Sequence, residues 1–147
     1  MLVKNFEQVV RFYEARQDSN GPSIWLPLVD VTLITPANSR VSLSLLFDTG
    51  ASFTTLRADL YPILGLQSWD QGIRVESCTA GGPTIVYRYI YTLEIFGKTI
   101  IDCPIHLSSQ LPQNPLFVGL LGRDTVFNEF GFGFWESTHE LYNTTNP

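Results

Sequence analysis

Residues 45–52 read Leu-Leu-Phe-Asp-Thr-Gly-Ala-Ser, an apolar stretch that ends at Asp48 and continues in small residues. Burying a lone carboxylate at the end of an apolar strand is costly unless hydrogen bonds or a function compensate for it. Gly50 lets a ligand or another chain approach the backbone closely. Asp-Thr-Gly also suits an ordinary hairpin turn, because Asp and Gly are common turn residues. The tripeptide alone therefore leaves both a turn and a functional site open.

On both sides of this stretch the sequence alternates between apolar and polar residues, as β-strands do. Strands are predicted over residues 29–33, 41–47, 73–79, 85–96, 99–107, 116–121 and 132–135, with a turn at residues 96–98. Short helices are predicted within residues 57–64 and 123–130. Many short strands separated by Gly and Pro turns indicate an all-β barrel or sandwich with little helix.

The two ends of the chain have a different pattern. Phe6, Val9, Val10 and Tyr13 recur at helical spacing, which predicts an amphipathic helix in the first sixteen residues. Residues 17–23 are polar and contain Gly-Pro, as linkers do. The last twelve residues are polar and are expected to be loose, apart from Leu141 and Tyr142. We therefore divide the chain into an extension (1–23), one domain (24–135) and a tail (136–147).

The bulk composition narrows the possible partners. The chain has 147 residues, 44% of them hydrophobic, and a net charge of −5, which suits one folded domain. An acidic balance argues against nucleic acid and anionic membranes as partners. No apolar run reaches the roughly 18 residues of a membrane span, and none follows Lys4 as in a secretory signal, so an intracellular location is favoured.

Few residues have the chemistry of a metal or redox site. Cys78 and Cys103 are expected to be two unpaired thiols, although one bridge between them is possible. His106 and His139 are isolated in the sequence and are interpreted as surface or satisfied core histidines. Neither a metal nor a cofactor is therefore expected.

A second motif changes the weight given to Asp-Thr-Gly. Residues 117–124 read Phe-Val-Gly-Leu-Leu-Gly-Arg-Asp, again an apolar strand that ends in glycine before a predicted helix. Between the two motifs lies a long hairpin with Ala80, Gly81 and Gly82 at its tip. This order resembles the retropepsins, the retroviral-type aspartic proteases, in which Asp-Thr-Gly-Ala, a glycine-tipped flap and Gly-Arg-Asp or Gly-Arg-Asn follow one another. The resemblance covers roughly residues 24–135.

The resemblance implies a closed or partly open acid-protease barrel with a flap hairpin and one or two short helices. Asp48 would be the catalytic aspartate, and Thr49 would support the site by a hydrogen bond to its counterpart. The residues that would bind substrate are Gly50, Ala51 and Ser52 in the cleft and Ala80, Gly81 and Gly82 at the flap tip. Leu120, Leu121 and Gly122 would pack behind the catalytic loop.

One Asp-Thr-Gly in a chain of this length implies that a second copy supplies the other carboxylate, in a C2 homodimer. The leading hypothesis is an aspartic endopeptidase that cleaves extended peptides with apolar side chains at the scissile bond. The alternative is a catalytically silent relative that only dimerises or binds peptides. One departure from the viral pattern is Ser52, which replaces the usual acid. The partner of Arg123 is therefore left open between Asp59, Asp124 and a dimer mate.

Overall fold

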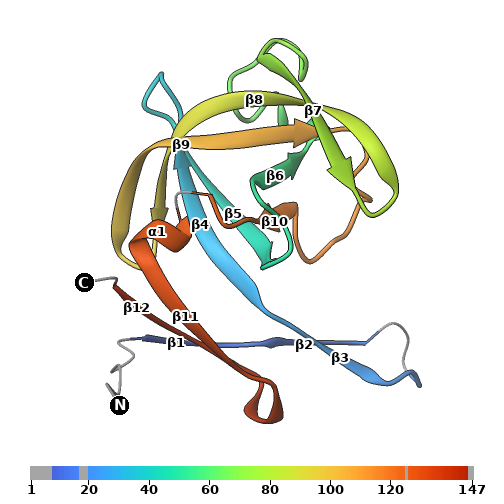
Figure 1. Cartoon of the computed structure of the whole chain (residues 1–147), viewed down its shortest axis with the longest axis vertical. Helices are drawn as coiled ribbons and strands as arrows, with labels where there is room; N and C mark the ends of the chain where they lie inside the picture. The colour runs from blue at the N-terminus through green and yellow to red at the C-terminus, as the bar shows by residue number, and fades with distance from the viewer. Residues whose placement is uncertain (1–7, 17–19, 125, 146–147) are drawn as a thin grey trace.

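A computed structural model describes residues 8–16, 20–124 and 126–145, and strands dominate these residues (Figure 1). The strands are β1 (Gln8–Arg11), β2 (Tyr13–Arg16), β3 (Ser23–Leu26), β4 (Leu28–Ile34), β5 (Arg40–Phe47), β6 (Thr54–Arg57), β7 (Ile73–Thr79), β8 (Gly82–Ile95), β9 (Lys98–Ser108), β10 (Gly119–Leu121), β11 (Phe130–Trp135) and β12 (Glu140–Thr145). The helical elements are short: α1 (Val126–Glu129) and the 3-10 turns η1 (Ala58–Leu60) and η2 (Glu136–Thr138). The mostly β prediction is confirmed.

The central sheet closes on itself. Its strands follow the order β4-β5-β10-β6-β9-β8-β7. A further pairing of β4 with β8 closes the first six of these strands into a ring. Two pairs are parallel, β10 with β5 and β6 with β9, while the other pairs are antiparallel. The predicted acid-protease type of barrel is therefore what the chain forms, with β7 outside the closed ring.

Alternating apolar residues fill the ring. Val29, Val31 and Leu33 of β4 are nearly inaccessible to solvent, and they face a core that also contains Leu45 and Ile105. Because side chains on a strand point alternately to the two faces, this spacing places one apolar face of each strand inward. Polar residues between them, such as those of β4 and β5, stay on the outer face.

The β7–β8 hairpin extends from the barrel as the predicted flap (Figure 1). β8 is long enough to serve two partners along one edge, since residues 82–88 pair with β7 and residues 92–94 pair with β4. Its other edge pairs with β9 almost throughout. The tip lies at Ala80–Gly81, and Gly82 has a φ of +112°, a conformation that favours glycine.

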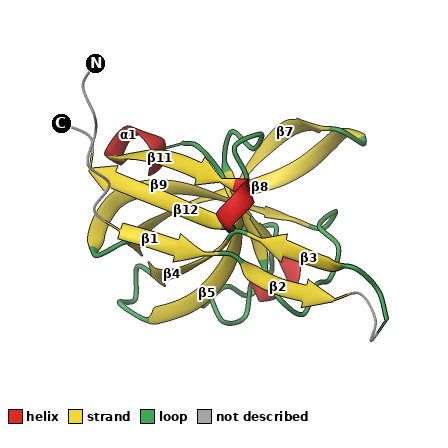
Figure 2. Cartoon of the chain, turned by 90° about the horizontal axis from the view of Figure 1, so that it is seen from below, coloured by secondary structure: helices red, strands yellow, loops and turns green. Residues whose placement is uncertain are grey.

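A second, smaller sheet lies below the barrel in the view of Figure 1, and its strands β1, β12 and β11 lie side by side in that order in Figure 2. The helix predicted in the first sixteen residues is wrong for residues 8–16, and residues 1–7 lie outside the described range. Val9 pairs with Tyr142 and Tyr13 pairs with Leu26, so both halves of this segment are strands. β-branched and aromatic residues favour strands, and sheet partners distant in sequence outweigh a weak helical pattern.

The loose tail predicted for residues 136–147 is also wrong where it is described. β12 lies between β1 and β11, and the polar residues Asn143 and Thr144 are buried, as is Leu141, which was excepted from the prediction. The linker predicted over residues 17–23 contains a turn at residues 20–21, ahead of β3, while residues 17–19 lie outside the described range. The extension and the tail thus share one sheet.

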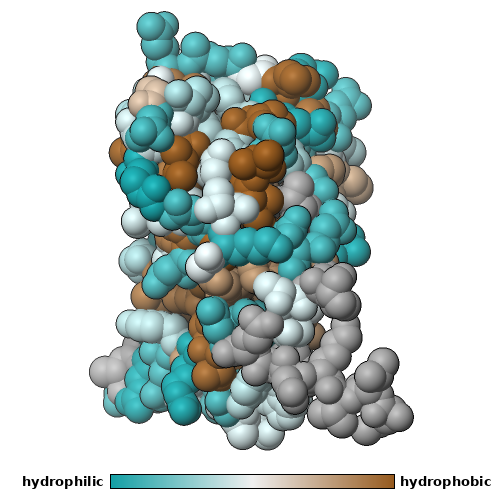
Figure 3. Space-filling model, turned by 90° about the vertical axis from the view of Figure 1, so that its left-hand side faces the viewer, coloured by the Kyte–Doolittle hydropathy of each residue, from teal (hydrophilic) through white to brown (hydrophobic). Residues whose placement is uncertain are grey.

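The surface carries scattered apolar side chains. They gather in several separate groups on the face seen in Figure 3, among polar residues. Both cysteines are free, as predicted, with Cys78 exposed and Cys103 buried. Within the described residues, no helix combines the length and the apolar character that crossing a membrane requires.

Candidate active site

Asp48 is the first residue after β5, and backbone hydrogen bonds hold it there. Its N–H donates to the carbonyl of Leu121 on β10 (3.1 Å), and its own carbonyl accepts from the N–H of Ala51 (3.2 Å). The side-chain Oδ1 accepts from the N–H of Gly50 at 2.9 Å. The carboxylate is therefore oriented by its own loop, through a turn of the kind that Asp side chains commonly cap.

The loop after Asp48 is bound to the segment that follows β10. The N–H groups of Arg123 and Asp124 donate to the carbonyls of Ala51 (3.0 Å) and Ser52 (2.8 Å). Gly122 donates its N–H to Thr54 Oγ1 at 3.1 Å. The two motifs found in the sequence, residues 45–52 and 117–124, are thus brought together by parallel pairing of β5 with β10.

Asp48 opens into a cleft of about 530 Å³ under the flap. The floor and walls come from the loop after Asp48 and from β6, β9 and β10, and the cover comes from residues 77–80 of the β7–β8 hairpin. The lining residues are Asp48, Gly50, Ala51, Ser52, Phe53, Thr55, Ser77, Cys78, Thr79, Ala80, Thr84, Val86, His106, Ser108, Gln110, Leu111 and Leu120. A mixed apolar and polar cleft of this size is typical of a ligand site.

Most of the predicted site residues meet at this cleft, and three do not. Thr49 is exposed and lies outside the lining. Gly81 and Gly82 border a separate hollow, together with Pro83 and other residues of the flap and the loop after β9. Of the predicted flap-tip residues, only Ala80 faces Asp48 across the cleft in the single chain.

Ser52 and Arg123 contact each other directly. Arg123 Nη2 donates to Ser52 Oγ at 3.2 Å, so a hydroxyl stands where the viral pattern has an acid. Asp59, one of the candidate partners of Arg123, instead pairs with Arg57 at 3.1 Å. The arginine therefore still ties the helix side of the site to the catalytic loop, through a neutral partner.

The polar side chains that line one wall of the cleft, above all His106, were not predicted as site residues from the sequence. This histidine is 2% exposed, and its Nε2 accepts a hydrogen bond from Arg88 Nε at 3.1 Å. Burial, and then the charge of Arg88, lower the pKa of His106 to about 4, although Asp124 opposes the shift. The signal was present in the alternation of β9: His106 and Ser108 share one face of the strand, while Ile105 and Leu107 share the other.

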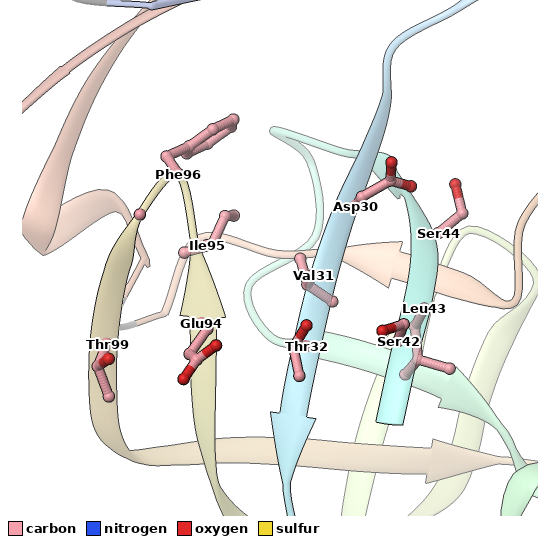
Figure 4. A pocket seen from close by; sticks show the side chains of 11 residues that line it. Asp30, Val31, Thr32, Ser42, Leu43, Ser44, Glu94, Ile95, Phe96 and Thr99 are labelled. Carbon is pink, nitrogen blue, oxygen red and sulfur yellow. The ribbon is translucent and has the colours of Figure 1, made fainter. Parts of the chain in front are cut away.

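A larger hollow, of about 780 Å³, lies on the outer surface over β4, β5 and the β8–β9 turn (Figure 4). Asp30 and Glu94 are its acidic residues, and Glu94 is bound to Arg40. None of the residues from the two motifs lines it. We therefore place the candidate site at the Asp48 cleft, where the oriented carboxylate and the covering β7–β8 hairpin occur together.

The comparisons with known proteins concern the family and the fold of the chain. A family model described as aspartyl protease matches residues 31–125. A retropepsin-like aspartic protease from Rickettsia conorii has a similar structure, with a TM-score of 0.57 and 20% identity over 100% of both chains. EIAV protease in complex with the inhibitor HBY-793 has a TM-score of 0.51 and 22% identity over 69% of this chain and 86% of that chain. A search of curated proteins finds no significant match.

Proposed function

The chain belongs to the aspartyl protease family, and we propose that it is an aspartic endopeptidase whose active site is completed by a second copy of the chain. The observation that carries this proposal is the position of Asp48. Its carboxylate is held at the end of a buried strand, at the floor of a cleft that a hairpin covers. A peptide in extended conformation could add to the cleft as a strand.

The chemistry requires two carboxylates that share one proton. Two acids in close contact cannot both ionise easily, so one stays protonated while the other is charged. The charged member takes a proton from a water molecule, which attacks the scissile carbonyl carbon. The protonated member donates to the carbonyl oxygen, and a tetrahedral intermediate forms without a covalent acyl-enzyme.

Three features of the chain support a C2 dimer at this site. The residues next to Asp48, Thr49 and Gly50, are exposed. Phe134 of β11 packs its ring 5.2 Å from Phe47, the residue before Asp48, and yet is 43% exposed. Within the described residues, β11 pairs only with β12, so its other edge is open. A partner that brings a second Asp48 to the first would cover all three features.

The test of this proposal replaces Asp48 by the isosteric asparagine. With a quenched fluorescent peptide library as substrate, Asp48→Asn should lower kcat/KM by at least about 10²–10⁴-fold, the contribution of general acid–base catalysis. Asp30→Asn makes the same chemical change in the outer groove and should leave activity unchanged. Full activity of Asp48→Asn would refute the assignment, and peptide binding without cleavage by the wild type would favour a silent binding module.

The same variant tests whether two chains share one site. When wild type and Asp48→Asn are mixed in equal amounts and reassort, about half of the wild-type chains acquire an inactive partner. The activity per wild-type chain should then fall about twofold, while an equal amount of Asp30→Asn should not lower it. An activity that is independent of added Asp48→Asn would mean that each chain acts alone.

A further inference from the structure

Three polar residues lie in a row on neighbouring strands, and two of them, Thr55 and His106, form part of one wall of the Asp48 cleft. Thr55 on β6 pairs with His106 on β9, and His106 pairs with Arg88 on β8. Cross-strand partners point to the same face of a sheet, so the three side chains lie side by side. Thr55 and His106 line the cleft together with Asp48, and Ser108 extends the polar strip along β9.

His106 is built into this wall as a hydrogen-bond donor. Because Nε2 accepts from Arg88, the proton of the neutral ring belongs on Nδ1. The low pKa of His106 keeps the ring neutral near neutral pH. The ring is held 4.5 Å from the ring of Phe53, and Arg88 Cζ lies 5.2 Å from the same ring. No hydrogen bond from Nδ1 is formed to any described residue.

The surroundings of His106 also favour an acceptor. Among the described residues the fully buried side-chain atom without a hydrogen-bond partner is Asn143 Nδ2, so His106 Nδ1 keeps access to the cleft that His106 lines. An acceptor on a ligand would take the place of water at this donor. Arg88 forms no ion pair within the described part of the chain, and its positively charged group lies next to Nε2 of the ring. Asp124 is the nearby acid and partly balances that charge. Ser108 accepts from the N–H of Gln110 at 3.1 Å, which leaves its hydroxyl proton free to donate.

From these contacts we infer that the cleft contains a polar subsite, formed by His106, Thr55 and Ser108, that takes a substrate side chain ending in a carbonyl or carboxylate oxygen. Glutamine, glutamate, asparagine and aspartate share this chemistry. The inference rests on the proposed function, because it assumes that a peptide lies in the cleft. It adds that one substrate position is polar, beside positions served by the apolar Leu111 and Leu120.

Calorimetry with non-hydrolysable peptides tests the subsite independently of catalysis. The peptides carry a reduced peptide bond and differ only in having Leu, Gln or Glu at each position around that bond. At one position the wild type should bind the Gln or the Glu peptide at least about 10-fold more tightly than the Leu peptide, equivalent to about 1.4 kcal/mol. The Gln and Glu arms tell whether the amide or the charged oxygen is preferred.

Three variants assign the preference to the ring. His106→Leu should abolish it and improve binding of the Leu peptide. His106→Asn retains an N–H donor and should keep most of it. His139→Asn changes the other histidine, which stacks on Trp25 outside the cleft, and should change nothing. If His106→Leu does not fold, the ¹⁵N shift of wild-type His106 Nδ1 decides, since it should respond to the Gln peptide and not to the Leu peptide.

The outcomes separate this inference from the proposed function. Equal or tighter binding of the Leu peptide at every position, or a Gln preference that survives His106→Leu, would overturn the subsite while leaving the protease assignment intact. An Asp48→Asn variant with full activity would overturn the mechanism while leaving the binding preference in place. Absence of binding by every peptide would overturn the subsite and the peptide-binding role of the cleft together.

Discussion

Gly122 packs against the backbone that directly follows the Asp48 loop, and replacing it should loosen that loop. A Cβ added to Gly122 would lie 2.3 Å from both the carbonyl carbon and the oxygen of Phe53 and 2.8 Å from the nitrogen of Thr54. All three are backbone atoms, so no side chain can rotate away. Gly122→Ala must therefore push the end of β10 away from the start of β6.

The expected loss in the free energy of unfolding has two sources, the overpacking itself and the hydrogen bonds that the displacement stretches. Overpacking typically costs about 1–3 kcal/mol, and more when backbone has to move. The shift also stretches the bonds from Gly122 to Thr54 and from Arg123 to Ala51, each worth roughly 0.5–1.5 kcal/mol. We expect Gly122→Ala to lower the free energy of unfolding by about 3 kcal/mol or more.

Urea unfolding followed by tryptophan fluorescence measures this loss, at one protein concentration for all variants because association contributes to stability. Gly81→Ala is the matched control: its added Cβ meets only Thr79 Oγ1, at 3.7 Å, and it should change stability by less than about 0.5 kcal/mol. A loss below about 1 kcal/mol for Gly122→Ala, or equal losses for both variants, would refute the reasoning.

Two further predictions concern His106 and the open edge of β11. The pKa of His106 is about 4 in the folded chain against an ordinary 6.5. Between these two values the unfolded chain binds more protons than the folded chain. The free energy of unfolding should therefore fall by up to about 3 kcal/mol as the pH drops from 6.5 to 4. Urea titrations at about pH 7 and about pH 4 should show this loss for the wild type and not for His106→Asn; equal losses would contradict the assignment. Phe134→Lys should raise the dimer dissociation constant at least about 10-fold in sedimentation experiments and lower activity in parallel. Ile101→Lys, at a site that is 70% exposed, should do neither, and an unchanged Phe134→Lys dimer would show that β11 is not at the interface.

The barrel could be predicted because each of its strands has a recognisable pattern within its own short stretch of sequence. β4, β5 and β8 carry apolar residues at a spacing of two, and turns that contain Pro36 and Gly97 follow β4 and β8. A strand buried on one face needs no knowledge of its partner to be recognised. The position of Asp48 was likewise predictable, since an apolar strand that runs into an acid and a glycine is unusual in itself.

The lower sheet could not be predicted in the same way. β1 and β12 lie at opposite ends of the sequence, and each depends on the other for its hydrogen bonds. Asn143 and Thr144 look like tail residues because they are polar, yet they are buried between β1 and β11. A polar residue is exposed only when no distant segment packs over it. The residues around Asn143 carry no pattern that reveals the pairing of β12 with β1.

His106 was missed for a related reason. A single histidine between Ile105 and Leu107 reads as a core residue, and it is indeed buried. What gives it a chemical role is Arg88, which is 18 residues away and is brought to it by the β8–β9 register. The proton position on the ring therefore depends on a pairing that the sequence does not display.

The bonds of the catalytic loop determine how activity should depend on assembly. Asp48 is held by Leu121, Gly50 and Ala51, all of its own chain, so its orientation does not require a partner. Thr49, the residue next to Asp48, is exposed and lies outside the cleft lining, where a second copy can reach it. A chain built this way has an ordered half-site before it dimerises. Association should therefore supply the second carboxylate without reorganising the first, and the rate per dimer should stay constant while dilution lowers only the number of dimers.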